Sequence, residues 1–391
     1  MKINQIKILL FLLILLCGLS ISPSSKGQVA VDKILWRKGT GGYNNFRIPS
    51  ILVTKKGTII AFCEGREGGD SGDINILTMR SSDNGKTWSN QSVIWDDAQN
   101  TCGNPCAVED SETGRIWLIL TWNNGKDGEG SIINKKSIDT RIPYSCYSDN
   151  DGITWSKPEK MPAACKDPSW GWYATGPGIG IQIKTGKYKG RLVIPANNSY
   201  DDPDNKLKGV PAGYGYGSHV LLSDDHGKSW RMGQTLKPGC NESQVTELSD
   251  GRLIMNMRSY NGKYCRAVSI STDGGDTWSE IKHDYQLVES ICQASILSYG
   301  EYKGRMMFLF ANPAVTSDRT HMTIKTSFDD CKSWTNSKLI FEGPSAYSCL
   351  TKLKNNNIGL FFECGNKSAY ETLRFISFKP EELFKPGVLV Q

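Results

Sequence analysis

Arginine, carboxylate and tyrosine side chains recur at corresponding points along this 391-residue sequence. Several guanidinium groups on one surface favour an anionic ligand, because a planar guanidinium grips a carboxylate through two hydrogen bonds. A carboxylate can move a proton in catalysis, and a tyrosine hydroxyl becomes a nucleophile when a nearby base removes its proton. The candidates for such chemistry are Arg47, Arg66, Arg258, Arg319, Asp70, Asp73, Glu242 and Tyr347.

The sequence contains six similar apolar hairpin units, which begin near Phe46, Asn104, Thr175, Asn241, Ile291 and Ala346, and the candidates occupy matching positions in four of them. In an antiparallel hairpin the start of the first strand lies beside the end of the second strand. Arg47 opens the first strand of unit one, Arg66 closes its second strand, and Tyr347 opens unit six. Glu242 and Arg258 hold the opening and closing positions in unit four. The loops after the second strands carry Asp70 and Asp73 in unit one and Arg319 in unit five. All eight side chains are therefore expected at the same end of the strands.

A short motif, Ser-x-Asp-x-Gly-x-Thr/Ser-Trp, follows the third strand of five units. Its Asp can bond nearby backbone amides, its Gly accepts a positive φ, and its Trp returns to the core, which suits a hairpin turn. Two copies are imperfect, with Asn150 at the Asp position and Cys331 at the Gly position. Because the motif follows the third strand, it is expected at the end opposite the candidate residues. The copies span residues 81–88, 148–155, 223–230, 271–278 and 327–334.

One such turn for every three strands, at a spacing of roughly 50 to 70 residues, is typical of propeller blades. The sequence therefore predicts an all-β, six-bladed β-propeller over residues 28–391. A β-solenoid or two packed sandwiches would also contain alternating strands, but neither explains the position of the turn motif. The longest insertion, residues 123–143, is polar and is expected to be a surface loop.

The first 27 residues resemble a secretory signal, with Lys2 and Lys7 ahead of an apolar stretch and a polar exit. They predict a secreted, periplasmic or cell-surface protein, and the apolar stretch is too short for a comfortable membrane span. Attachment of a lipid at Cys17 is the lesser alternative. The net charge of +6, with no run of Lys or Arg, gives no support for nucleic-acid binding.

Eleven of the twelve cysteines follow the leader, an odd number that cannot pair completely. Most stand inside apolar runs and are expected to be small core residues, although Cys102 and Cys106 are close enough to pair or to bind a metal. The four histidines are widely spaced. No metal site and no cofactor are therefore predicted, and a monomer is expected.

The segment Phe46-Arg47-Ile48-Pro49 resembles the Phe/Tyr-Arg-Ile-Pro motif of the sialidase (neuraminidase) family of the bacterial type. The five turn motifs resemble the Asp boxes, or BNR repeats, of that family. The resemblance extends from about Tyr43 to Leu373, across nearly the whole chain after the leader. Asp boxes also occur in propellers that are not enzymes, so the Arg-Ile-Pro segment together with the other site residues is the more specific signal.

The resemblance implies an exo-α-sialidase that removes terminal sialic acids from glycoproteins, glycolipids such as gangliosides, or oligosaccharides. It implies that Arg47, Arg258 and Arg319 bind the substrate carboxylate and that Arg66 lies near O4 of the sugar. A loop aspartate would be the acid/base residue, with Asp70 preferred over Asp73. The resemblance further implies that Tyr347 is the nucleophile, that Glu242 is its partner, and that the glycosidic bond is cleaved with retention.

Two other functions fit parts of the pattern. A non-catalytic propeller that binds anionic glycans would keep the Asp boxes, but it would not need Asp70, Glu242 and Tyr347 together. A trans-sialidase or an anhydro-forming enzyme would keep the same chemistry and change the acceptor. Trp122, Trp170 or Trp172 would then be candidates for the acceptor site.

Overall fold

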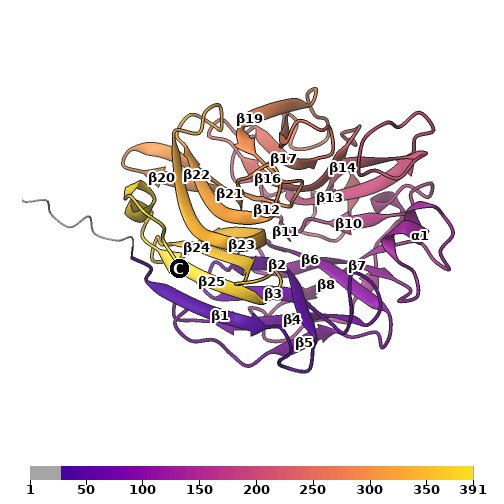
Figure 1. The fold of residues 1–391 in the computed structure, drawn as a ribbon, viewed down its shortest axis with the longest axis horizontal. Coiled ribbons are helices and arrows are strands. Elements are labelled where there is room, and N and C mark those ends of the chain that lie inside the picture. Colours follow the sequence, from indigo (N-terminus) through magenta and orange to yellow (C-terminus); the bar gives the residue numbers. More distant parts are fainter. Residues whose placement is uncertain (1–27, 391) are drawn as a thin grey trace, which may run out of the picture.

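The computed structural model describes residues 28–390 of the chain, which form sheets that follow one another around the molecule (Figure 1). The proposed leader, residues 1–27, lies outside the described residues, as does Cys17. Within each sheet the spatial order of the strands is mostly the chain order, so neighbouring strands are antiparallel hairpins.

The first three blades contain the N-terminal half of the propeller. Blade 1 consists of β2 (Asn45–Val53), β3 (Ile59–Arg66), β4 (Ile74–Ser81) and β5 (Ser92–Trp95). Blade 2 consists of β6 (Thr101–Glu109), β7 (Ile116–Asn123), β8 (Ile142–Ser148) and β9 (Glu159–Lys160), with α1 (Glu129–Ile133) between β7 and β8. Blade 3 consists of β13 (Leu192–Asp201), β14 (Tyr214–Ser223) and β15 (Arg231–Met232), with β10 (Tyr173–Thr175) and β12 (Ile181–Gln182) paired to the inner side of β13. The η1 turn (Ala163–Cys165) precedes it, and β11 (Gly178–Ile179), between β10 and β12, pairs with β6 of blade 2.

The last three blades complete the circle. Blade 4 consists of β16 (Cys240–Glu247), β17 (Leu253–Ser259), β18 (Cys265–Ser271) and β19 (Lys282–Val288). Blade 5 consists of β20 (Ser295–Tyr302), β21 (Arg305–Pro313), β22 (Thr320–Ser327) and the first part of β23 (Asn336–Lys352). Blade 6 consists of the second part of β23, β24 (Ile358–Cys364), β25 (Thr372–Phe378) and β1 (Val31–Arg37), and η2 (Pro380–Phe384) follows it.

The ring is closed by strand β1, which comes from the N-terminal side and pairs antiparallel with β25. The sequence analysis identified three strands per unit and did not identify this fourth strand. Because β1 and β25 lie at opposite ends of the chain, their pairing fastens the first blade to the last. The predicted six-bladed all-β propeller is confirmed.

Apolar side chains fill all six interfaces between neighbouring blades. At the closing interface, for example, Ile51 and Ala61 of blade 1 share a buried cluster with Phe361 and Phe375 of blade 6. Burying one such large side chain stabilises the fold by roughly 1.5–3 kcal/mol. The inner strands are covered on both faces; all eight residues of β3 are buried, including the charged Glu64 and Arg66 near its end.

The Asp-box copies form turns with a shared set of hydrogen bonds. In the first copy, Gly85 N–H donates to Ser81 Oγ (2.9 Å) and Thr87 N–H donates to Asp83 Oδ1 (3.0 Å). The Trp88 indole N–H donates to the Gly85 carbonyl (2.9 Å) and so anchors the ring that follows the turn.

The two imperfect copies keep this geometry. Asn150 accepts from Thr154 N–H at 2.9 Å, as an aspartate would. Cys331 adopts φ +60° and its N–H donates to Ser327 Oγ at 3.0 Å, so this turn tolerates a side chain where the others carry glycine. The altered residues therefore change the blade turns little and lie far along the strands from the candidate site.

Two further expectations concern cysteines and membrane spans. The eleven cysteines from Cys63 to Cys364 are free thiols and all are buried, which confirms their interpretation as core residues. Within residues 28–390 no helix is long and apolar enough to cross a bilayer.

Candidate active site

The innermost strands of blades 1, 4 and 6 each carry a β-bulge near their first residues. The register shifts between Arg47 and Ser50, between Cys240 and Ser243, and between Ser345 and Ser348. A bulge bends its strand and redirects the side chains beside it. These bulges hold Arg47, Glu242 and Tyr347, which the structure brings together at one end of the propeller.

Tyr347 and Glu242 form the centre of this group. The Tyr347 hydroxyl donates a hydrogen bond to Glu242 Oε1, and Arg258 Nη1 donates to Glu242 Oε2 at 2.7 Å. Arg258 Nη1 also lies 3.3 Å from the Tyr347 hydroxyl oxygen. Burial, together with the negative charge of Glu242, raises the pKa of Tyr347 well above its usual value. The resting hydroxyl is therefore protonated, with a carboxylate in place to accept its proton.

Arg47 and Tyr347 share a support that the sequence analysis missed, the carboxylate of Glu363. One Glu363 oxygen accepts from Arg47 Nε at 2.6 Å and from Ile48 N–H at 3.0 Å. The other oxygen accepts from the Tyr347 backbone N–H at 3.1 Å. Glu363 is fully buried, and it fixes the bulges of blades 1 and 6 relative to each other.

The Asp70 loop of blade 1 lies on another side of the site. Arg66 Nη1 donates to Asp70 Oδ1, and Arg47 Nη1 lies 3.8 Å from the same oxygen. Burial by itself would raise the pKa of Asp70, but the charge of Arg66 and its hydrogen bond hold the pKa below its usual value. The Asp70 side chain is exposed, with 76% of its surface accessible, so it faces the open end of the site. Arg66 Nε is held by Glu64 at 2.7 Å.

Asp73 lies in a different environment. Burial and the nearby charges of Asp96 and Glu67 raise its pKa, and its carbonyl accepts from Glu67 N–H at 3.1 Å. It forms no ion pair with an arginine among residues 28–390. Of the two loop aspartates, the structure brings Asp70 to the arginines and leaves Asp73 outside their contacts.

Arg319 reaches the site from the loop before β22. Its Nη1 donates to the Tyr370 hydroxyl at 2.9 Å and its Nη2 donates to the Ile291 carbonyl at 3.2 Å. Its guanidinium carbon lies 5.6 Å from the centre of the Tyr347 ring. Within residues 28–390 Arg319 has no carboxylate partner, so its charge is available to an anionic ligand.

The arginines of the site have more carboxylate partners than the eight candidate residues alone provide. Glu363 pairs with Arg47 and Glu64 pairs with Arg66, and neither acid was identified from the sequence. Both lie on buried strands, so a search for acids at the ends of apolar strands would have found them. Glu363 stands near the end of β24, the second strand of blade 6, as Arg66 stands at the end of β3 in blade 1.

The insertion at residues 123–143 is more than the surface loop that was expected. Its Arg141 is buried and donates to the Asn104 side chain at 2.7 Å. The Arg141 guanidinium lies over the Trp172 ring at 4.5 Å, and its charge helps to lower the pKa of Asp70 after the stronger effects of Arg66 and Arg47. Most of residues 124–140 lie at the surface as predicted, but the polar composition of the insertion does not reveal that its final residues turn back into the propeller.

The three tryptophans considered for an acceptor site lie in different places. Trp172 is beside Arg141 and packs in the same cluster as Tyr260, whose hydroxyl accepts from Arg258 Nη2 at 2.6 Å. Trp122 donates instead to Asp97, and Trp170 is buried against Tyr173. Only Trp172 of the three contacts residues of the site.

Comparison with known proteins shows which class of protein this chain belongs to. Residues 57–360 match the BNR repeat-like domain family. The chain is 31% identical over 370 residues to a sialidase of Micromonospora viridifaciens, a match that covers 91% of this chain and 55% of that protein. It is also 31% identical over 371 residues to an exo-alpha-sialidase of Aspergillus fumigatus, which covers 87% and 82% of the two chains.

Solved structures agree with this result. The Hadza microbial sialidase Hz136 superposes with a TM-score of 0.76 at 30% identity, covering 87% of this chain and 67% of that chain. An intramolecular trans-sialidase from Ruminococcus gnavus superposes with a TM-score of 0.72, covering 88% and 96% of the two chains, but at 21% identity it supports the fold alone. The fold and the repeats define a BNR-repeat propeller, and its relatives place it more narrowly. The chain belongs to the sialidase family. It spans 55% of the Micromonospora protein and 62% of a Bacteroides fragilis sialidase.

Proposed function

We propose that this protein is an exo-α-sialidase, which hydrolyses terminal sialic acids from sialylated glycoproteins, glycolipids or oligosaccharides with retention of configuration. Its relatives are named as sialidases or exo-alpha-sialidases, and this supports the substrate class. The observation that carries the proposal is the hydrogen bond from the Tyr347 hydroxyl to Glu242 between Arg47, Arg258 and Arg319.

The arginines would bind the substrate first. Sialic acid carries a carboxylate on its anomeric carbon, and Arg319 has no competing acid. Arg47 and Arg258 are each held by a glutamate at one edge of the guanidinium, which fixes their direction. A planar guanidinium that is already oriented loses less entropy when it binds a carboxylate.

In the first chemical step the Tyr347 oxygen attacks the anomeric carbon while the bond to the leaving-group oxygen breaks. Glu242 takes the phenolic proton, and Asp70 donates a proton to the leaving oxygen. A neutral hydroxyl avoids the repulsion that a carboxylate nucleophile would meet beside the substrate carboxylate. Sialidases as a class are the established tyrosine exception to the use of two carboxylates by glycosidases.

In the second step water attacks the anomeric carbon, and the bond to the Tyr347 oxygen breaks. Asp70 accepts the proton from water, and Glu242 returns a proton to the phenolate. Two successive inversions give overall retention. Because the lowered pKa of Asp70 leaves it ionised in the free enzyme at neutral pH, we expect kcat/KM for substrates with poor leaving groups to rise as the solution becomes more acidic.

The proposal is tested with a fluorogenic α-sialoside and the variant Tyr347→Phe, which removes one oxygen atom. The unaltered protein should release free sialic acid, and the variant should be slower by about three orders of magnitude or more. An NMR time course should show the α-anomer appearing first. Binding of sialic acid without turnover would favour a glycan-binding propeller instead, and an anhydro or transferred product would favour a trans-sialidase.

We also propose that residues 1–27 direct the protein out of the cytoplasm and are removed. The apolar stretch after Lys7 supports this proposal. Mass spectrometry of the protein from its source should give an N-terminus near Gln28. A lipid adduct on Cys17 would indicate a lipoprotein instead.

A further inference from the structure

Three aromatic rings meet at the end of blade 5 that carries its Asp box. Tyr302 ends β20 just before its tight turn into β21, Phe328 lies within the fifth Asp box, and Phe384 ends η2. The ring centres of Tyr302 and Phe384 are 5.9 Å apart, those of Phe328 and Phe384 are 6.3 Å apart, and those of Tyr302 and Phe328 are 6.5 Å apart. We call these three residues the aromatic platform.

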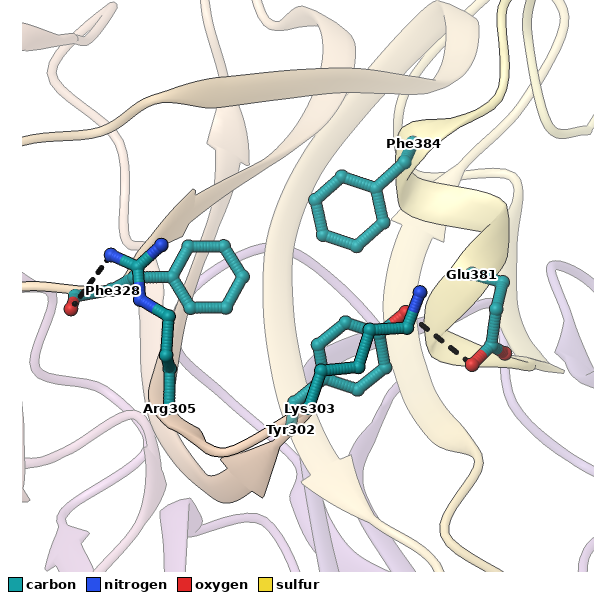
Figure 2. Close-up of a pocket in the computed structure, with 6 residues that line it drawn as sticks. All are labelled: Tyr302, Lys303, Arg305, Phe328, Glu381 and Phe384. Atoms are coloured by element: carbon teal, nitrogen blue, oxygen red, sulfur yellow. Dashed lines mark hydrogen bonds between the residues drawn. The ribbon is translucent and has the colours of Figure 1, made fainter.

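The platform presents its ring faces in one direction. The angles between the ring planes are only 12°, 24° and 28°. Figure 2 shows the three rings side by side with their faces towards the viewer. They line a depression of about 300 Å³, and Phe384 remains 44% exposed. This volume is at the lower end of the range of small-ligand sites, roughly 300–1,000 Å³.

Charged groups border the platform and lie over two of its rings. Lys303 Nζ lies 5.2 Å from the centre of the Tyr302 ring, and the guanidinium of Arg305 lies 4.7 Å from the centre of the Phe328 ring. Arg305 Nη2 donates to the Phe328 carbonyl, and the Tyr302 hydroxyl donates to Glu381. Two cations and one carboxylate line the depression, so its rim carries a net positive charge.

The platform is separate from the candidate active site. The β20–β21 turn and the fifth Asp box belong to the end of the blades that carries the Asp boxes, whereas the arginines lie at the other end of the strands. A molecule on the platform would therefore not compete for the same space as one bound at Tyr347.

We propose that the aromatic platform is a second glycan-binding site, which takes one or two sugar rings of an acidic glycan. The flat face of a pyranose ring carries C–H groups with partial positive charge, and these are attracted to the negative face of an aromatic ring. Three nearly coplanar rings, whose planes differ by at most 28°, offer such a surface. Lys303 and Arg305 would bind the sugar carboxylate at the rim.

This proposal adds a site to the proposed sialidase and does not depend on its turnover. Such a site would hold the enzyme on a polymer that carries many sialic acids, and so raise the local concentration of substrate.

The test is affinity electrophoresis of the protein through gels that contain sialylated mucin or the same mucin after chemical removal of sialic acid. All variants carry Tyr347→Phe so that the glycan stays intact. Phe384→Ala shortens the platform, Arg305→Gln removes a rim charge without removing an aromatic ring, and Tyr285→Ala is a matched control at another exposed aromatic side chain.

We expect Phe384→Ala to weaken retention in the sialylated gel by about fivefold, since one aromatic contact contributes roughly this much. Arg305→Gln should weaken retention in the sialylated gel and leave the desialylated gel unchanged, and Tyr285→Ala should change neither. If Phe384→Ala is retained as strongly as Tyr285→Ala, the platform is not a glycan-binding site. If Arg305→Gln loses the same retention in both gels, the glycan bound there is not recognised by its negative charge. Because every variant keeps the same active site, failure of the proposed sialidase activity would leave this comparison intact.

Discussion

Replacing Glu363 with glutamine keeps the shape of a fully buried side chain and removes its charge. The carboxylate accepts three hydrogen bonds, from Arg47 Nε at 2.6 Å, from Ile48 N–H at 3.0 Å and from Tyr347 N–H at 3.1 Å. Glutamine has a single acceptor oxygen, so it cannot satisfy donors on both sides.

The cost follows from these contacts. In the better orientation the amide oxygen faces Arg47 and Ile48, and its NH₂ group then opposes the Tyr347 N–H. A buried donor without a partner costs about 1–3 kcal/mol. Breaking a buried ion pair completely costs about 3–5 kcal/mol, and here Arg47 keeps one hydrogen bond, so this contribution is the smaller part. We expect Glu363→Gln to lower the free energy of unfolding by about 2–5 kcal/mol in total.

The assay combines urea unfolding with kcat/KM on an α-sialoside. Because Arg47 and Tyr347 lose their shared support, kcat/KM should fall by about 10- to 100-fold, the effect of a small displacement of reacting groups. Glu280→Gln, at an exposed position, is the control and should change stability by less than about 0.5 kcal/mol. A loss below about 1 kcal/mol in Glu363→Gln, with kcat/KM unchanged, would refute this account of the site.

Two further predictions concern aspartates. Asp70→Ala should lower kcat/KM for a sialylated oligosaccharide by about 10²–10⁴-fold. It should affect an aryl sialoside much less, because a good leaving group needs no proton. Asp73→Ala should leave both rates unchanged, and the reverse pattern would assign the acid to Asp73. Hydrogen bonds from Thr87 lower the pKa of Asp83 from 3.8 to about 2. The stability that this ionised group provides is complete above pH 3.8 and is lost as the pH falls towards 2. Asp83→Asn, which copies the natural Asn150, should therefore flatten the decrease of Tm over that range; an unchanged pH profile would contradict the role of Asp83.

Local patterns in the sequence were sufficient for the architecture. The Asp-box turn depends on hydrogen bonds within four residues, such as the one from Gly85 N–H to Ser81 Oγ. Each copy of the motif therefore predicts a turn at its own position. Alternation of these turns with apolar hairpins identified six blades and the end of the strands to which Arg47, Glu242 and Tyr347 belong. This reasoning needed only the antiparallel order of strands within a hairpin.

Tertiary structure decided what surrounds those residues. Arg47 and Glu363 are 316 positions apart, and no local pattern indicates that blade 6 supplies the carboxylate that orients an arginine of blade 1. The pairing of β1 with β25, the return of Arg141 into the site and the separation of Asp70 from Asp73 also depend on packing between distant segments. The blades and the types of side chain at their ends can be read from the sequence, because they follow from short-range hydrogen bonding and strand periodicity. Closure of the ring decides which arginines and carboxylates pair in the site, because it brings blade 1 beside blade 6.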